Sequence, residues 1–297
     1  MTVAKVTSAS YGNLGVKGTK MDNEMTAITG VILTTPAFTD TIANIALEAT
    51  WTAGIKAGTV MPLTGLDSYE DQSSDDTIYE SALQKRKLLK RGKKRFMFQL
   101  DDPLAVHRTL QTYYNNADLR VWLIRDGKIC FYNNGGNAEG FGTSMINVGM
   151  MKEVPADGST PAFTPLYVDI NNYREWDIYG EFIEPTWSVE SLEALVDVEV
   201  EISGSPTSSQ VIVKVYAADG YASDGTVKEV AIKGIIEADF VVGFGTAVSM
   251  TDNADGTYTF TSSAAFSTGT VNLKAPSAMA STGLLIKSTG AATVTIA

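Results

Sequence analysis

Residues 119–132, LRVWLIRDGKICFY, carry the clearest fold signal in this sequence. Two runs rich in β-branched and aromatic residues flank the pair Asp126-Gly127. A two-residue hairpin turn needs positive φ at both central positions, which is why Asp-Gly is preferred there. The stretch therefore predicts two antiparallel strands joined by a tight turn, in a chain of mainly β fold.

The residues before this hairpin predict one strand and two helices. A strand over 26–35 is followed by a helix over 41–56, because apolar residues recur there at helical spacing. Asp40 is the expected N-cap, and Gly58 stands where a glycine follows a helix end. A second helix is expected over 103–115, starting at an Asp-Asp-Pro sequence.

The residues after the hairpin contain further strands, and their pattern changes near Leu192. Strands are expected over 143–154 and from 166 toward 179. From Leu192 onward, short runs of period-two alternation follow one another to the end of the sequence without a helical pattern. A chain of 297 residues is long enough for two domains. We therefore expect a β-sandwich or barrel with one or two short helices over 1–188, and an all-β immunoglobulin-like sandwich over 192–297.

Residues 67–95 separate positive and negative charge sharply. The first part holds six acids and no base, and the second part holds eight bases and no acid. We expect a loop for the acidic part and a β-hairpin over 84–98, turning near Arg91-Gly92, for the basic part. The candidate interface residues are Asp67, Glu70, Asp71, Asp75, Asp76, Glu80, Lys85, Arg86, Lys87, Lys90, Arg91, Lys93, Lys94 and Arg95.

Three functions compete for this charged stretch: a contact between subunits, a solvated face and a nucleic-acid site. The net charge of −11, from 34 acids and 23 bases, disfavours binding to the nucleic-acid backbone. We therefore expect the acidic loop of one copy to meet the basic hairpin of another, and not the hairpin of its own chain. Such a contact would fix register and orientation more than affinity.

Catalytic residues are scarce. The chain has one histidine, His107, and one cysteine, Cys130. A serine triad or a cysteine–histidine dyad would need His107, and a site with several histidine ligands is impossible. We expect no enzyme, no catalytic residues and no cofactor, with His107 packed or half-exposed on a helix and Cys130 buried as a small apolar residue.

Four aspartates, Asp219, Asp224, Asp252 and Asp255, raise the alternative of calcium binding. The spacing of an EF-hand loop is absent, and Asp-Gly forms turns without a metal. Turns are the favoured interpretation, and no metal site is predicted.

No stretch of the sequence has the length and hydrophobicity of a membrane span, and the first residues lack the apolar core of a secretory signal. A single cysteine allows no disulfide within the chain. We expect folding in a reducing cytoplasm and no membrane partner.

Two stretches resemble known families. The run DNADGTYTF at 252–260, followed by GTVNL at 269–273, resembles the hairpin of bacterial immunoglobulin-like domains that are appended to phage structural proteins. The order of elements in the N-terminal part resembles that of bacteriophage tail-tube proteins. The residues that carry this second resemblance are Ala49-Thr50-Trp51 with Ile55, Pro62-Leu63-Thr64-Gly65, Tyr69-Glu70-Asp71, the hairpin 84–98 and the helix 103–114.

The resemblance implies a virion structural protein, assembled in the host cytoplasm, whose rings stack as the tail tube. Its partners would be copies of itself and other virion proteins, with DNA only as passing cargo. A capsid decoration or head–tail connector protein is one alternative. A carbohydrate-binding or adhesion module is another, although it would need an exposed aromatic platform and the four tryptophans are scattered along the sequence.

Overall fold

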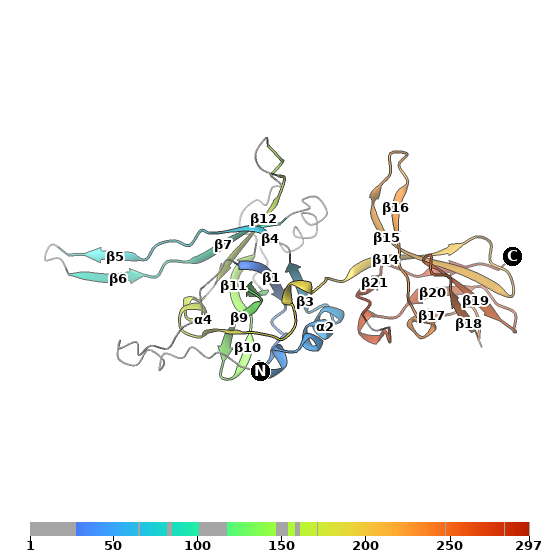
Figure 1. The fold of residues 1–297 in the computed structure, drawn as a ribbon, viewed down its shortest axis with the longest axis horizontal. Helices are drawn as coiled ribbons and strands as arrows, with labels where there is room; N and C mark the ends of the chain where they lie inside the picture. Colours follow the sequence, from blue (N-terminus) through green and yellow to red (C-terminus); the bar gives the residue numbers. More distant parts are fainter. Residues whose placement is uncertain are drawn as a thin grey trace. The chain divides into compact units, whose positions relative to one another are not determined.

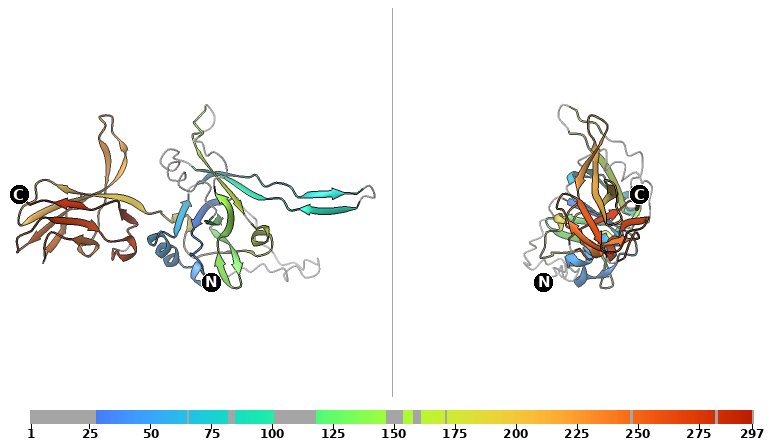
Figure 2. Two further views of the ribbon diagram at one scale, coloured as in Figure 1. Left: turned by 180° about the vertical axis from the view of Figure 1, so that it is seen from behind. Right: turned by 90° about the vertical axis from the view of Figure 1, so that its right-hand side faces the viewer.

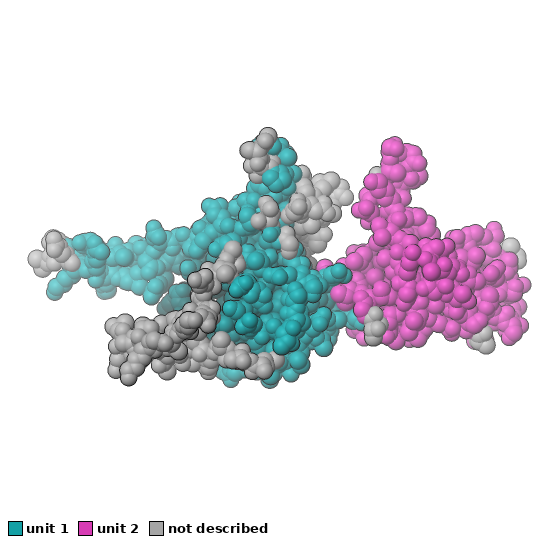
Figure 3. Space-filling view, in the orientation of Figure 1, with its two compact units in different colours: residues 1–193 teal, residues 194–297 magenta. Residues whose placement is uncertain are grey.

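The computed structural model describes residues 28–64, 66–81, 85–100, 118–146, 154–157, 161–170, 172–246, 248–281 and 283–296. The chain divides into two compact units, Met1–Glu193 (unit 1) and Ala194–Ala297 (unit 2), which Figure 3 colours separately. Both units consist mainly of β-strands, which confirms the predicted fold class (Figures 1 and 2). The expected helix 103–115 lies outside the described residues.

The elements of unit 1 are β1 (Ile28–Thr34), β2 (Asp40–Thr41), α1 (Ile42–Ile45), α2 (Glu48–Lys56), β3 (Val60–Thr64), β4 (Leu66–Asp71), β5 (Thr77–Glu80), β6 (Arg86–Lys90), β7 (Lys94–Leu100), β8 (Arg120–Arg125), β9 (Lys128–Asn134), β10 (Asn137–Glu139), β11 (Phe141–Ile146), β12 (Thr164–Ile170), α4 (Tyr173–Asp177), β13 (Gly180–Ile183) and the 3₁₀ turn η2 (Val189–Ser191). Those of unit 2 are β14 (Val196–Ser203), β15 (Gln210–Tyr221), β16 (Val227–Ala231), η3 (Glu237–Asp239), β17 (Phe240–Val242), β18 (Val248–Asp252), β19 (Thr257–Ser262), β20 (Gly269–Leu273), η4 (Pro276–Ala278), β21 (Ile286–Ser288) and β22 (Ala292–Val294).

Unit 1 is organised around an 11-stranded sheet in the order β2-β10-β9-β8-β11-β12-β7-β4, with β1 and β3 joined through β8 and β13 paired to β9. The sheet curls into a half-barrel. The hairpin expected at 119–132 is its β8–β9 pair, and both turn residues have positive φ, 51° at Asp126 and 68° at Gly127. That prediction is confirmed.

Strand β8 is buried on both faces. Val121 and Leu123 point into the core inside the curled sheet. Trp122 points the other way and packs edge-on against Trp51 of α2, with ring centroids 5.0 Å apart. Its indole Nε1 donates to the Thr34 hydroxyl at 3.0 Å. Burial on both sides explains why the sequence reads VWLI without alternation. Both tryptophans are fully buried, so neither can serve an exposed aromatic platform.

The prediction of a single helix over 41–56 is wrong, because the chain forms α1 and α2 instead. Leu47 between them is extended, with φ −96° and ψ 128°, and this interrupts the helix. The N-cap of α1 is Thr41 and not Asp40. The glycine after the helix end is confirmed, since Gly58 has a φ of 71°.

The strand expected from 166 toward 179 is also interrupted. β12 ends at Ile170, and α4 begins after Asn172, whose side chain accepts a hydrogen bond from the Arg174 N–H at 3.1 Å. Asparagine favours such caps, which explains the change from strand to helix. The expected strand 143–154 corresponds to β11, which ends at Ile146, and residues 147–153 lie outside the described part.

Unit 2 contains a six-stranded sheet, β18-β19-β15-β14-β21 with β16 on β15, and a three-stranded sheet, β17-β20-β22. One core formed by both sheets lies between them, as a sandwich requires. The alternation in β14 places Val198 and Val200 inside while Glu199 and Glu201 face water. The run DNADGTYTF forms the β18–β19 hairpin.

The boundary between the units follows Glu193 and not residue 188. The residues after 188 belong to unit 1 because they pack on it. Val189 is fully buried, Glu190 accepts a hydrogen bond from the Thr29 hydroxyl at 3.0 Å, and the Leu192 carbonyl accepts one from Thr64.

Candidate assembly surface

The acidic and basic runs form the two sides of one hairpin, not a loop followed by a hairpin. β4 pairs with β7 and β5 pairs with β6, so residues 66–80 run antiparallel to residues 86–100. The antiparallel pairing extends as far as Ser81 and Lys85, where the Ser81 N–H donates to the Lys85 carbonyl at 2.9 Å. The turn predicted at Arg91-Gly92 is therefore wrong.

The outer part of this hairpin, residues 72–93, is called the arm here. Figures 1 and 2 show β5 and β6 standing away from the rest of unit 1. Gly92 lies along one side of the arm, where a Cβ would be 1.7 Å from the Ser74 carbonyl oxygen. The glycine is needed for this close approach of two strands and not for a turn.

Two ion pairs join the sides of the arm within one chain. Arg86 Nε lies 3.2 Å from Glu80 Oε2, and Arg91 Nη1 lies 3.3 Å from Asp76 Oδ2. Asp76 Oδ1 also accepts a hydrogen bond from the Gly92 N–H at 2.7 Å. The prediction that these acids and bases meet only between copies is wrong, because the hairpin places them opposite each other. Exposed pairs of this kind contribute only about 0–1 kcal/mol each.

Arg95 belongs to the fold of unit 1 and not to the arm. Its Nε and Nη2 lie 2.5 and 2.8 Å from the two carboxylate oxygens of Asp169, which is buried in β12. This hydrogen bond raises the pKa of Arg95. The two-pronged pair links β7 to β12 directly below the arm.

Three of the predicted acids, Asp67, Glu70 and Asp71, lie in β4. Burial alone would raise the pKa of Asp71, but hydrogen bonds from Ser73 and the charge of Lys94 outweigh it, so the pKa is lowered. Asp71 therefore has a local function, which is to hold the chain where β4 leads into the arm.

Positive charge remains on the arm after these pairings. Lys85, Lys87, Lys90 and Lys93 are exposed and form no ion pair with any described residue. The arm holds six bases and three acids, a net +3, so the remainder of the −11 chain carries −14. The arm is a cationic element on an otherwise acidic protein.

Large apolar side chains are also exposed on the arm, and the sequence predictions did not include them. Ile78, Tyr79, Leu88 and Leu89 are between 46% and 60% exposed. Every residue of β5 and β6 is exposed, and no third described strand pairs with them. An isolated two-stranded ribbon is marginally stable in water, and exposed apolar groups mark interaction sites. The alternation in TIYE and the pair Leu88-Leu89 were the available signals.

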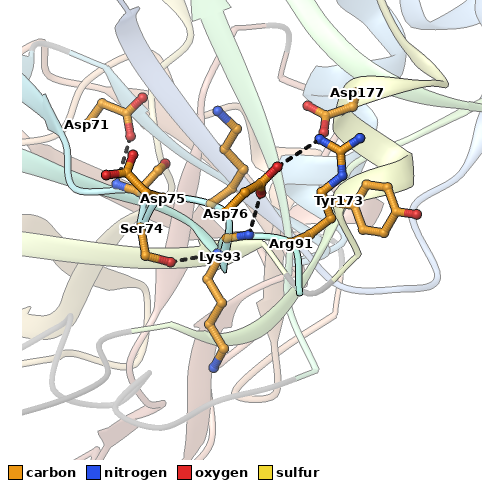
Figure 4. A pocket seen from close by; sticks show the side chains of 11 residues that line it. Asp71, Ser74, Asp75, Asp76, Arg91, Lys93, Tyr173 and Asp177 are labelled. Carbon is orange, nitrogen blue, oxygen red and sulfur yellow. Dashed lines mark hydrogen bonds and ion pairs between the residues drawn. The ribbon is translucent and has the colours of Figure 1, made fainter. Parts of the chain in front are cut away.

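A polar hollow of about 550 Å³ lies between the base of the arm and α4 (Figure 4). The Arg91 guanidinium sits over the Tyr173 ring, 5.4 Å from its centroid. Lys93, Asp75 and Asp177 also line the hollow, so both signs of charge are present. The contact between Arg91 and Tyr173 attaches the arm to α4 and thereby holds its direction.

The aspartates considered for calcium have local partners. Asp224 and Asp255 each accept hydrogen bonds from the N–H and hydroxyl of the threonine two residues later, which lowers the pKa of both. Asp252 accepts one from the Gly234 N–H at 3.0 Å, and Asp219 lies in β15. Across the described ranges, no three histidine, cysteine or acidic side chains gather as metal ligands would.

Of the two residues considered for catalysis, only Cys130 is described. It is half-buried in β9, and burial raises its pKa to about 11. The side chain is therefore a neutral thiol near pH 7 and not an activated nucleophile. His107 lies outside the described residues.

In the part of the chain that the structure describes, no helix has both the length and the apolar composition needed to cross a bilayer.

No protein-family model, curated protein or solved structure matches this chain.

Proposed function

We propose that this chain is a non-enzymatic virion structural protein that assembles into rings, and that the rings stack as a phage tail tube through which DNA passes. The observation that carries the proposal is the arm, whose apolar side chains stay in water in a single copy. Fully burying one such side chain stabilises by about 1.5–3 kcal/mol, so completing the burial of a half-exposed one contributes roughly half of that. Four such residues on one ribbon favour assembly.

Open sheet edges support the same proposal. Among the described strands, β4 pairs only with β7, and β3 pairs only with β1. Unpaired edges accept strands of other chains. Copies joined edge to edge would close into a ring, and the arm would then reach a copy beyond that ring.

The charge distribution fits a tube that conducts DNA without binding it. Unit 1 outside the arm carries −9. A lumen lined by this surface would repel phosphates and release no counterions, so DNA would slide. Unit 2, a separate compact unit, would lie outside the lumen, where other virion proteins could contact it.

Negative-stain imaging of the purified protein tests the proposal, and tubes are the expected result. Single rings would favour a connector. Monomers at every concentration would reject self-assembly.

A variant carrying Ile78→Ser, Tyr79→Ser, Leu88→Ser and Leu89→Ser should stay monomeric with an unchanged circular dichroism spectrum. The matched control is Val227→Ser, Val230→Ser and Val241→Ser, which removes similarly exposed side chains from unit 2 and should still assemble.

A further inference from the structure

The two faces of the arm differ in chemistry. Directly opposed residues of an antiparallel pair share a face, and successive residues alternate between faces. One face, called the apolar face, therefore holds Ile78, Leu88, Glu80 and Arg86. The opposite face, called the cationic face, holds Tyr79 and Lys87, while Leu89 falls at a register shift and has no opposed residue.

The charged side chains of the apolar face form an ion pair with each other, whereas Lys87 on the cationic face forms none with a described residue. Glu80 and Arg86 neutralise each other at 3.2 Å beside Ile78 and Leu88. Lys87, across from Tyr79, has no ion pair with any residue that the structure describes. A dry apolar surface would therefore suit the first face, and an acidic surface would suit the second.

Both faces need cover. Ile78 is 55% exposed on the apolar face and Tyr79 is 54% exposed on the cationic face. A surface that lies flat against a two-stranded ribbon covers one face and leaves the other in water. Two surfaces are required to remove both side chains from water.

We infer that the arm is held between two other copies of this chain, with a different copy against each face. This inference rests on the proposed self-assembly and names the partners of its contact. The part of the other copy that covers the cationic face lies outside its own arm, because the arms carry unpaired lysines whereas the rest of the chain carries −14. Each arm therefore joins three chains.

Photocrosslinking tests this arrangement on the full chain. A photoreactive benzoylphenylalanine is placed at Leu88, at Tyr79, or at both, and the assemblies are imaged before illumination. The single-label chains should give crosslinked dimers, and mass spectrometry should identify different target peptides for the two positions. The double-label chain should give crosslinked trimers. A chain with the photoreactive residue at Val241, which is 53% exposed in unit 2, is the control that measures nonspecific crosslinking.

Salt distinguishes the two faces further. The Debye length falls from about 10 Å at 0.1 M to about 3 Å at 1 M. The Tyr79 crosslink should therefore lose several-fold in yield over this range, while the Leu88 crosslink should not.

Dimers as the largest product of the double-label chain would overturn the inference while leaving the proposed function intact, because one copy would then wrap both faces. The same holds if both labels reach one target peptide. If the unlabelled chain forms no assembly, the proposed function fails and the inference fails with it.

Discussion

Gly92 lies so close to Ser74 that a Cβ on the glycine would be 1.7 Å from the Ser74 carbonyl oxygen. Around this point the Ser74 N–H donates to the Lys93 carbonyl at 3.0 Å, and the Ser74 hydroxyl accepts from the Lys93 N–H at 2.8 Å. The base of the arm is thus a tight joint made by backbone approach and short polar side chains. Its geometry decides where the arm points.

Gly92→Ala should therefore displace the arm without unfolding unit 1. The added methyl group cannot fit against backbone, and such overpacking costs about 1–3 kcal/mol. Amide exchange at residues 72–76 and 91–95 should accelerate, and the assembled fraction measured by sedimentation should fall. Gly290→Ala is the control, since nothing lies within 4 Å of a Cβ there. Unchanged exchange and assembly in Gly92→Ala would show that the joint does not position the arm.

Removing Arg95 should destabilise unit 1 through Asp169. The Asp169 carboxylate is buried, and Arg95→Met leaves it without its two-pronged partner. Loss of one member of a buried pair costs about 3–5 kcal/mol, and the lower end is expected because Arg95 is partly exposed. Urea unfolding measures this loss. The double variant Arg95→Met, Asp169→Leu should recover most of it, and failure to recover would mean that the pair itself contributes the stability.

The boundary between the units predicts how the chain can be shortened. A chain ending at Glu193 keeps Val189 and Leu192 against unit 1, whereas one ending at Ser188 loses both. Residues 1–193 should fold and assemble, and residues 1–188 should unfold at a lower temperature. Thermal melts of the two chains measure the difference. Equal melting temperatures would contradict the packing of these residues on unit 1.

Local patterns in the sequence predicted those parts of the fold that depend on local chemistry. The turn at Asp126-Gly127 and the glycine after the helix could be predicted because positive φ restricts residue choice. The mainly β class follows from period-two alternation, as in β14. The break at Leu47 could not be predicted, because the apolar spacing on both sides continues as in one helix.

The arm shows why charge alone could not predict which acids and bases meet. The sequence marks where acids and bases lie, but strand pairing over 66–100 decides which of them meet. Gly92 resembles a turn glycine until its partner strand is known. The exposed state of Ile78 and Leu88 is also a tertiary property, since the same alternation in β14 leads to burial.

Acid should weaken the turns of unit 2. Hydrogen bonds from the following threonines lower the pKa of Asp224 and Asp255 in the folded chain. Their contribution is fully present above the unfolded value, about 3.9, and is lost as the pH falls through the lower folded value. The melting temperature of the full chain should therefore decrease when the pH is lowered below about 4.

Asp224→Ala with Asp255→Ala should lower the melting temperature at pH 7 and reduce its decline in acid. Asp197→Ala, a change on the outer side of β14, is the charge control, and equal pH profiles for the two variants would contradict the prediction.

Reversing the unpaired lysines of the arm should block assembly while the fold remains. Lys87→Glu, Lys90→Glu and Lys93→Glu change exposed side chains that form no ion pair with described residues. The free energy of unfolding of the monomer should therefore change by less than about 1 kcal/mol. In an assembly the three new carboxylates would face the acidic remainder of other copies, and like-charge contacts oppose association.

The matched control is Lys228→Glu, Lys233→Glu and Lys287→Glu, which makes the same change in net charge on exposed residues of unit 2. Sedimentation at about 0.05 M salt should show tubes for the wild type and the control, and monomers for the arm variant. Because screening shortens the Debye length to roughly 3 Å at 1 M, the arm variant and the wild type should approach the same assembled fraction at high salt. The apolar face, which salt does not screen, would then drive what assembly remains. Normal tubes from the arm variant at low salt would show that the lysines are a solvated surface and that the arm binds through its apolar residues alone.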